Sequence, residues 1–230
     1  MARHSSVASG FKDKMHIWIK ICGTTSLGDA LASVEAGADA LGFIFAPSKR
    51  QVAVSGARQI IRQLPPHVER IGVFLDAQPE EIRAVLDEVQ LTGIQMHGSE
   101  SSAQIYQQLP PVQRDSLFKI KAIIVRDSLE MPDVKSVDAW LLDSGAGSGK
   151  IFDWDLAKAK LKDRSRRIIL AGGLTPENVG KALLTIRPWG VDVVTGVESE
   201  PGRKDHRKLN AFVSAVREAE NEEAWEARQS

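Results

Sequence analysis

The sequence has one cysteine, one tyrosine, no long apolar run and no excess of charge of either sign among its 230 residues. Lys and Arg number 30 and Asp and Glu also number 30, so no overall field attracts nucleic acid or an acidic membrane surface. No apolar run approaches the roughly 18 residues of a membrane-spanning helix. We therefore expect a soluble protein without a nucleic-acid or membrane partner, which recognises any phosphate group locally.

The single cysteine and several absent motifs narrow the chemistry. One thiol cannot form an internal disulfide, which fits the reducing cytoplasm and leaves open why the thiol is kept. No G-x-G-x-x-G follows the first apolar run, and the loop GAGSGK at 145–150 fails the P-loop pattern because Ile151 follows Lys150. No cluster of His and Cys has the spacing of metal ligands. The sequence thus argues against a dinucleotide site, an NTPase site and a metal site.

The first 14 residues, MARHSSVASGFKDK, differ in composition from the rest of the chain. They are polar and basic and lack the apolar segment of a secretory signal, and Met15 stands immediately before the first apolar run. A short organellar leader rich in Arg and Ser is the alternative. We expect a flexible extension over residues 1–14 and a single domain over residues 15–230.

Short apolar runs alternate with stretches of helical periodicity eight times along the chain. The expected strands are 16–21, 40–45, 70–74, 93–96, 117–122, 139–142, 167–170 and 191–194. The expected helices are 27–36, 55–64, 79–89, 101–109, 128–135, one from 154, 176–185 and one from about 206. Runs such as LGFIF are apolar on both faces, and eight such units in one domain predict an α/β fold of the (β/α)8 TIM-barrel type. An open doubly wound sheet is the alternative.

Two candidate catalytic residues stand where apolar runs end, which is where barrel enzymes of this type place their chemistry. Cys22 follows the first run, and Gly23 permits a turn that would present the thiol to a cleft. Asp143 ends the sixth run, where a carboxylate is costly unless it caps, pairs or reacts. The alternatives are a small buried hydrophobe for Cys22 and a loop cap for Asp143.

Glycines after the seventh and eighth runs are candidates for binding an anion. Gly172 and Gly173 precede Thr175 and Pro176, a suitable N-cap and first helical residue, and Gly196 follows the eighth run. Backbone amides there would face the recurrent phosphate position of this fold, although glycines can also simply form turns. We expect these three glycines to bind phosphate.

Further polar groups follow the second and fourth runs. Lys49 and Arg50 are either a solvated pair or a clamp for a substrate carboxylate, which suits the planar fork of arginine. Gln95 and His97 either contact a ligand or have a structural role.

An ordered set of motifs then identifies a family. Segments KICGTTS, ADALGFIF, SKR, IGVFLD, IQMHG, LLDS, GSGKIFDW, LAGGLTPENV and DVVTGVESEPGRKD resemble the phosphoribosylanthranilate isomerases of tryptophan biosynthesis, from about Ile17 to Val216. The resemblance implies Cys22 as general base and Asp143 as general acid. It implies Arg50 as the ligand of the anthranilate carboxylate, with further substrate or phosphate contacts from Gln95, His97, Gly172, Gly173, Asp192 and Gly196.

The implied reaction is an Amadori rearrangement of an aminoaldose phosphate to an aminoketose phosphate, which requires no cofactor because the substrate nitrogen accepts the electrons. The partner would be a small phosphorylated substrate, and the chain a monomer or a homodimer. The histidine-pathway isomerase is a rival, but it has an aspartate at the base position. An indole-glycerol phosphate synthase would need further lysine and glutamate at strand ends, and a non-catalytic barrel would have no need of Cys22 and Asp143.

Overall fold

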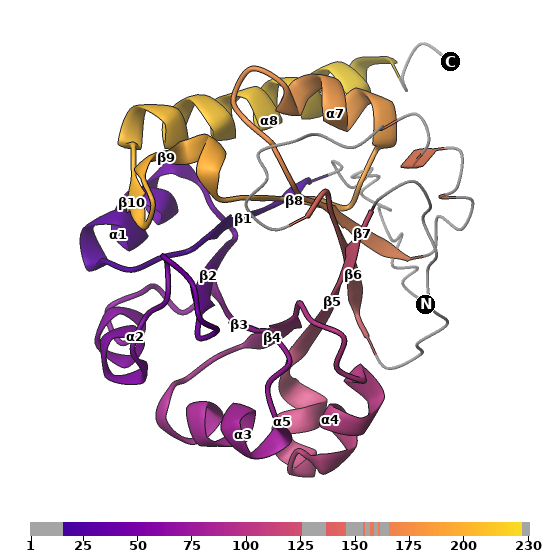
Figure 1. Cartoon of the computed structure of the whole chain (residues 1–230). Coiled ribbons are helices and arrows are strands. Elements are labelled where there is room, and N and C mark those ends of the chain that lie inside the picture. The colour runs from indigo at the N-terminus through magenta and orange to yellow at the C-terminus, as the bar shows by residue number, and fades with distance from the viewer. Residues whose placement is uncertain are drawn as a thin grey trace, which may run out of the picture.

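The computed structural model describes residues 16–125, 137–145, 154, 157–158, 161 and 166–226, and its centre is a closed barrel of eight parallel strands (Figure 1). The strands are β1 (Trp18–Cys22), β2 (Ala40–Ile44), β3 (Glu69–Phe74), β4 (Gly93–Met96), β5 (Phe118–Ile124), β6 (Ala139–Asp143), β7 (Arg167–Leu170) and β8 (Gly190–Val193). Each strand pairs with the next in chain order, and β8 closes the ring by pairing with β1. This confirms the predicted barrel and excludes the open sheet.

Helices surround the strands, as Figure 1 shows. They are α1 (Leu27–Ala36), α2 (Val54–Ile61), α3 (Pro79–Glu88), α4 (Ser102–Gln108), α5 (Pro111–Ser116), α7 (Val179–Ile186) and α8 (His206–Glu226). Local signals fix their ends: the Ser26 side chain accepts a hydrogen bond from the Asp29 amide at the start of α1, and Gly37 ends that helix with φ +105°.

The alternation of side chains along each strand separates two apolar regions. Residues such as Ile19 and Ile21 face the helices, whereas Trp18, Ile71 and Ile120 fill the barrel interior. Polar and sulfur-containing side chains, among them Lys20, Cys22, Gln95 and Asp192, are also buried along the barrel strands. The buried side chains of the barrel strands are therefore mostly apolar but include several polar ones.

Several boundaries differ from the sequence prediction. The first strand covers Trp18–Cys22, so Cys22 is its last residue and does not follow it. The helix expected from Pro176 begins at Val179 after a turn, with Asn178 in place of Thr175 as its N-cap. The extension 1–14, the helix expected at 128–135 and most of the helix expected from 154 lie outside the described residues.

Four elements were not expected. Helix α5 follows directly on α4, and the 3-10 turn η1 (Thr195–Val197) leads from β8 into an antiparallel hairpin of β9 (Glu198–Glu200) and β10 (Arg203–Lys204). The hairpin lies beside α1 in Figure 1. None of the helices in the described part of the chain combines the length and the apolar character needed to cross a bilayer.

Candidate active site

A cavity of about 210 Å³ lies at the C-terminal ends of the strands and collects the predicted site residues. Those that line it are Cys22, Arg50, Gln95, His97, Asp143, Gly172, Gly173 and Asp192. Gly196 directly follows Thr195, another lining residue. Residues from six of the strands or the loops that follow them, widely separated in the sequence, therefore share one pocket, in the position that this fold uses for catalysis.

Cys22 lines this pocket and is 3% exposed. Its backbone is fixed from two sides, because the amide of Gly23 bonds to the carbonyl of Gly42 and the Nζ of Lys204 donates to the carbonyl of Cys22 at 2.6 Å. Burial raises the pKa of the Cys22 thiol, and the ammonium groups of Lys20 and Lys204 act against that rise. The resting thiol is therefore held in its neutral form.

Lys20 is a buried charge that the sequence analysis did not place in the site. Its side chain is 0% exposed, and its Nζ lies 3.0 Å from Oδ1 of Asp192 on β8. Burial lowers the pKa of Lys20, but the charges and hydrogen bonds of Asp192 and Cys22 together outweigh burial, and the net shift is upward. The signal was available, since alternation along β1 puts Lys20 on the same face as Cys22.

Asp143 ends β6 and is half-buried at the pocket wall. Its Oδ1 accepts a hydrogen bond from the amide of Gly145 at 2.8 Å, and its Oδ2 lies 3.7 Å from Nε2 of His97. Burial raises the pKa of Asp143, while His97 and the Gly145 amide lower it, and burial wins. A raised pKa favours the protonated form that a general acid needs.

Gln95 and His97 form a pair on one face of the chain at β4. Nε2 of Gln95 lies 3.2 Å from Nδ1 of His97; since an amide nitrogen only donates, His97 accepts through Nδ1. A neutral His97 would then carry its proton on Nε2, which faces Asp143. Among the described residues, Oε1 of Gln95 and Nε2 of His97 have no hydrogen-bond partner although both are buried, so a polar ligand could satisfy them.

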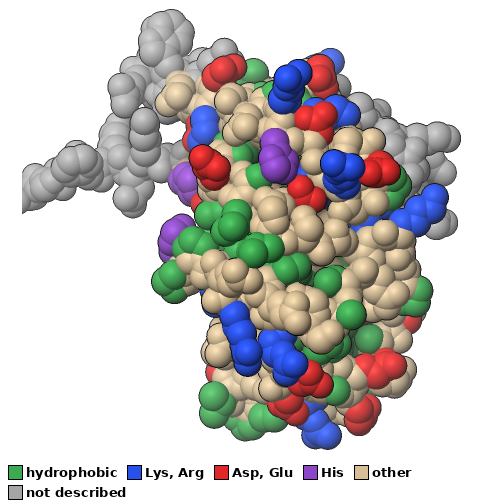
Figure 2. Space-filling model, turned by 90° about the vertical axis from the view of Figure 1, so that its left-hand side faces the viewer, with side chains coloured by type: hydrophobic (Ala, Val, Ile, Leu, Met, Phe, Trp, Pro, Cys, Tyr) green, Lys and Arg blue, Asp and Glu red, His purple; other side chains and the backbone are tan. Residues whose placement is uncertain are grey.

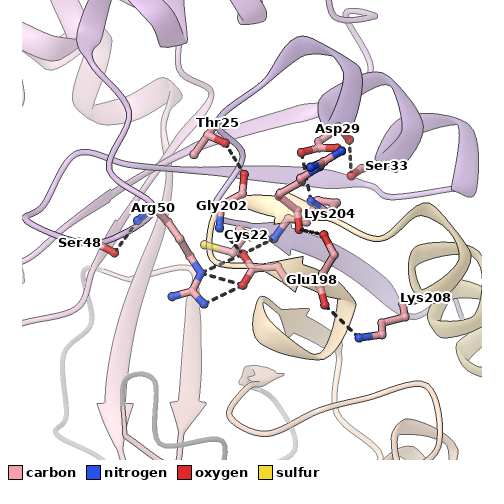
Figure 3. Close-up of polar contacts among 12 residues, drawn as sticks. Cys22, Thr25, Asp29, Ser33, Ser48, Arg50, Glu198, Gly202, Lys204 and Lys208 are labelled. Atoms are coloured by element: carbon pink, nitrogen blue, oxygen red, sulfur yellow. Dashed lines mark hydrogen bonds and ion pairs between the residues drawn. The ribbon is translucent and has the colours of Figure 1, made fainter.

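Arg50 is held by the hairpin that follows β8 (Figure 3). Its Nε donates to both carboxylate oxygens of Glu198 at 2.8 and 3.0 Å, and its Nη2 donates at 2.7 Å. Lys204 Nζ, which binds the carbonyl of Cys22, lies 3.3 Å from Oε1 of Glu198. Glu198 and Lys204 are both buried, so one short hairpin fixes Arg50 and the end of β1 together.

The glycine loops after β7 and β8 pack backbone against backbone. Gly172 and Gly173 have φ of +82° and +66°, which L side chains rarely adopt. A Cβ on Gly172 would lie 2.3 Å from Oγ of Ser144, and one on Gly196 would lie 1.9 Å from the carbonyl oxygen of Leu174. Only glycine fits at these positions, so the loops can bring their amides close to one another and to a ligand.

The sequence matches the model of one known protein family. The model of the N-(5'-phosphoribosyl)anthranilate (PRA) isomerases matches residues 19–215. The chain belongs to this family. The PRA isomerase of Thermotoga maritima is 44% identical over 202 residues, which cover 85% of this chain and 96% of that protein. That of Pseudomonas fluorescens is 44% identical over 201 residues, covering 86% and 97%.

Solved structures of PRA isomerases share the barrel. The T. maritima structure has a TM-score of 0.75 and 40% identity, and the match covers 88% of this chain and 100% of that one. Another PRA isomerase, solved in complex with reduced 1-(o-carboxyphenylamino)-1-deoxyribulose 5-phosphate, has a TM-score of 0.73 and 39% identity over the same shares. The T. maritima protein is dimeric; whether this chain is a monomer or a homodimer stays a prediction.

The surface of this PRA isomerase family member agrees with its balanced charge. Acidic and basic side chains are interspersed on the face shown in Figure 2, the side on which α1 and α2 lie in Figure 1. In the part of the chain that the structure describes, no three His, Cys, Asp or Glu side chains converge as metal ligands would.

Proposed function

We propose that this chain catalyses the Amadori rearrangement of N-(5-phosphoribosyl)anthranilate to 1-(2-carboxyphenylamino)-1-deoxyribulose 5-phosphate in tryptophan biosynthesis. The observation that carries the proposal is that Cys22 and Asp143, one at the end of β1 and one at the end of β6, line one pocket together with the glycine loops. Membership of the PRA isomerase family supports the same substrate.

In the proposed mechanism, two side chains exchange protons with the substrate. Asp143 donates a proton to the furanose oxygen, the C1–O bond breaks, and the substrate nitrogen becomes part of a protonated Schiff base. This cation acidifies the C2 proton, which the thiolate of Cys22 removes. The resulting enolamine tautomerises to the ketone, so atoms and electrons balance without an external oxidant or reductant.

The protonation states constrain this mechanism. Burial raises the pKa of Cys22 and also that of Asp143, so the thiol remains the weaker acid of the two. Where the two groups share one proton, that proton then lies mainly on Cys22, which is the reverse of the reactive arrangement. The reactive form has its proton on Asp143 and its negative charge on Cys22, and its population depends on groups that stabilise the thiolate.

The two ends of the substrate have separate sites in the proposal. Backbone amides near Gly172, Gly173 and Gly196 would bind the phosphate, and Arg50 would bind the anthranilate carboxylate with the edge of its guanidinium that Glu198 leaves free. Gln95, His97 and Asp192 would contact the sugar and linking atoms between these ends. Anchoring both ends contributes orientation to the proton transfers at the centre.

The experiment compares Cys22→Ala and Asp143→Asn with the unaltered chain by following the loss of phosphoribosylanthranilate fluorescence. Each variant should lose about 10² to 10⁴ in kcat with an unchanged fold. Asp115→Asn, which alters an exposed carboxylate on α5, is the control and should keep full activity. Near-normal turnover in either test variant removes that residue's role. Preferential turnover of the histidine-pathway substrate refutes the assigned reaction.

A further inference from the structure

Lys20 is a buried lysine that the proposed reaction does not yet use. It lies two residues before Cys22 on β1, on the same face, and its side chain is 0% exposed. Burying an ammonium group is costly unless other charges or hydrogen bonds compensate. An apolar side chain of similar length would fill the barrel without that cost. Packing alone therefore does not explain why this position has a charged side chain.

The Nζ of Lys20 lies near two acidic groups, the carboxylate of Asp192 and the thiol of Cys22. Oδ1 of Asp192 lies 3.0 Å away, across the β1–β8 pairing. Gly42 of β2 is paired with Cys22. A Cβ added to Gly42 would lie 2.5 Å from Sγ of Cys22 and 3.0 Å from Nζ of Lys20. The missing side chain of Gly42 thus opens one small space that the sulfur and the ammonium group share.

We propose that Lys20 is a positioning residue for the base, whose ammonium group, held by Asp192 beside Cys22, is the counter-charge of the Cys22 thiolate. This inference rests on the proposed function for its catalytic consequence. No proton needs to leave Lys20: the Cys22 thiol gives its proton to water, the resulting thiolate shares the ammonium group with Asp192, and the sulfur becomes neutral again when it takes up the C2 proton. Lys20 would stabilise the minor form in which the thiol has lost its proton.

The charges around the thiol predict effects of opposite sign. Burial raises the pKa of Cys22, Lys20 lowers it, and Asp192 raises it; Lys204 also lowers it, and Arg50 lies close enough to interact with it. Removing Lys20 should therefore make the thiolate harder to form. Removing the charge of Asp192 should make it easier to form. A lysine that only filled space would cause neither change.

The test uses the single cysteine of the chain, because iodoacetamide alkylation then reports on Cys22 alone. We expect Lys20→Met to slow alkylation about tenfold or more at pH 8 and to move the pH profile of alkylation upward. Asp192→Asn should move the profile downward. In the isomerase assay, Lys20→Met should lower kcat and leave KM nearly unchanged, since Lys20 is fully buried and is not among the residues that line the pocket.

A double variant guards against misfolding. Lys20→Met alone leaves the Asp192 carboxylate buried without its partner, whereas Lys20→Met with Asp192→Asn leaves no lone charge and should restore the melting temperature. Its alkylation should remain slower than that of the Asp192→Asn variant. Lys121→Met is the matched control, because this lysine on β5 binds the carbonyls of Gly98 and Glu100 and should leave alkylation unchanged.

The outcomes separate this inference from the proposed function. An unchanged pH profile of alkylation in both variants that lack Lys20, or shifts of the same sign for Lys20→Met and Asp192→Asn, would overturn the role of Lys20. Alkylation requires no substrate, so it can support that role even if the chain fails to turn over phosphoribosylanthranilate. Conversely, normal isomerase activity with unshifted alkylation in Lys20→Met would leave the reaction intact and refute the counter-charge.

Discussion

Glu198 provides a test of how the hairpin after β8 contributes to substrate binding. Its buried carboxylate receives three contacts of 2.7 to 3.0 Å from Arg50 and lies 3.3 Å from Lys204. Glu198→Gln keeps the shape but leaves a single neutral oxygen as acceptor. A hydrogen bond to a charged group contributes about 1.5–3 kcal/mol and a neutral one about 1 kcal/mol. The substitution should therefore remove roughly 1–2 kcal/mol of the interaction free energy that holds the Arg50 side chain in place.

If Arg50 binds the substrate carboxylate, that loss should appear mainly in KM. About 1.4 kcal/mol corresponds to tenfold in affinity, so we expect Glu198→Gln to raise KM about tenfold and to change kcat much less. Steady-state kinetics with phosphoribosylanthranilate measures both. Glu200→Gln is the matched control on the same hairpin, because Glu200 is exposed and makes only a surface ion pair with Arg203. An unchanged KM in Glu198→Gln, or an equal rise in the control, refutes the reasoning.

The same substitution predicts a pH-dependent loss of stability. Burial raises the pKa of Glu198, but Arg50 and Lys204 outweigh it and the net shift is downward from 4.5. A carboxyl whose folded pKa is lowered stabilises the protein above its unfolded pKa and loses that contribution as the pH falls through the folded pKa. The difference in unfolding free energy between the unaltered chain and Glu198→Gln, measured with urea, should be about 3 kcal/mol at pH 7 and shrink below pH 4.5.

Three further predictions concern the pocket. Gly196→Ala should destabilise the fold by about 3 kcal/mol or more in urea unfolding, because its Cβ would meet a carbonyl oxygen at 1.9 Å, whereas Gly180→Ala, with open space around it, should not. The pH profile of kcat/KM should be bell-shaped, with its acid limb set by the titration of Asp143 and its alkaline limb by the titration of Cys22. Cys22→Ser should remove this alkaline limb. Arg50→Lys should raise KM, since an ammonium group cannot reproduce the fork that engages Glu198.

The strands could be predicted because each one satisfies a local rule. Both faces of a barrel strand are buried, so the apolar runs stand out from the polar loops, and all eight appear in order. Their ends depend on partners far away in the sequence. The first strand begins at Trp18 because that residue pairs with Gly190 of β8, and no local pattern around His16 or Ile17 contains this information.

Helix α5 and the hairpin were missed for different reasons. Pro110 and Pro111 suggest a break in the chain, but Pro111 is the first residue of a new helix, where its missing amide proton is no loss. The hairpin segment ESEPGRK reads as an exposed polar turn. Glu198 and Lys204 are nevertheless buried, because they contact Arg50 and the end of β1, contacts that only the closed barrel creates.

The sequence predicted the charged residues Arg50, Asp143 and Asp192 of the site, whereas Lys20, Glu198 and Lys204, three charged side chains that are buried in the structure, were missed. Three cations and two carboxylates interact around the sulfur of Cys22: Lys20, Arg50, Lys204, Asp192 and Glu198. With a neutral thiol this group has one positive charge in excess, and with a thiolate it is balanced. Removing one cation or one carboxylate from the group should therefore shift the thiol equilibrium in opposite directions. The raised pKa of the buried thiol is consistent with a base that is neutral at rest and is needed as an anion only during proton removal.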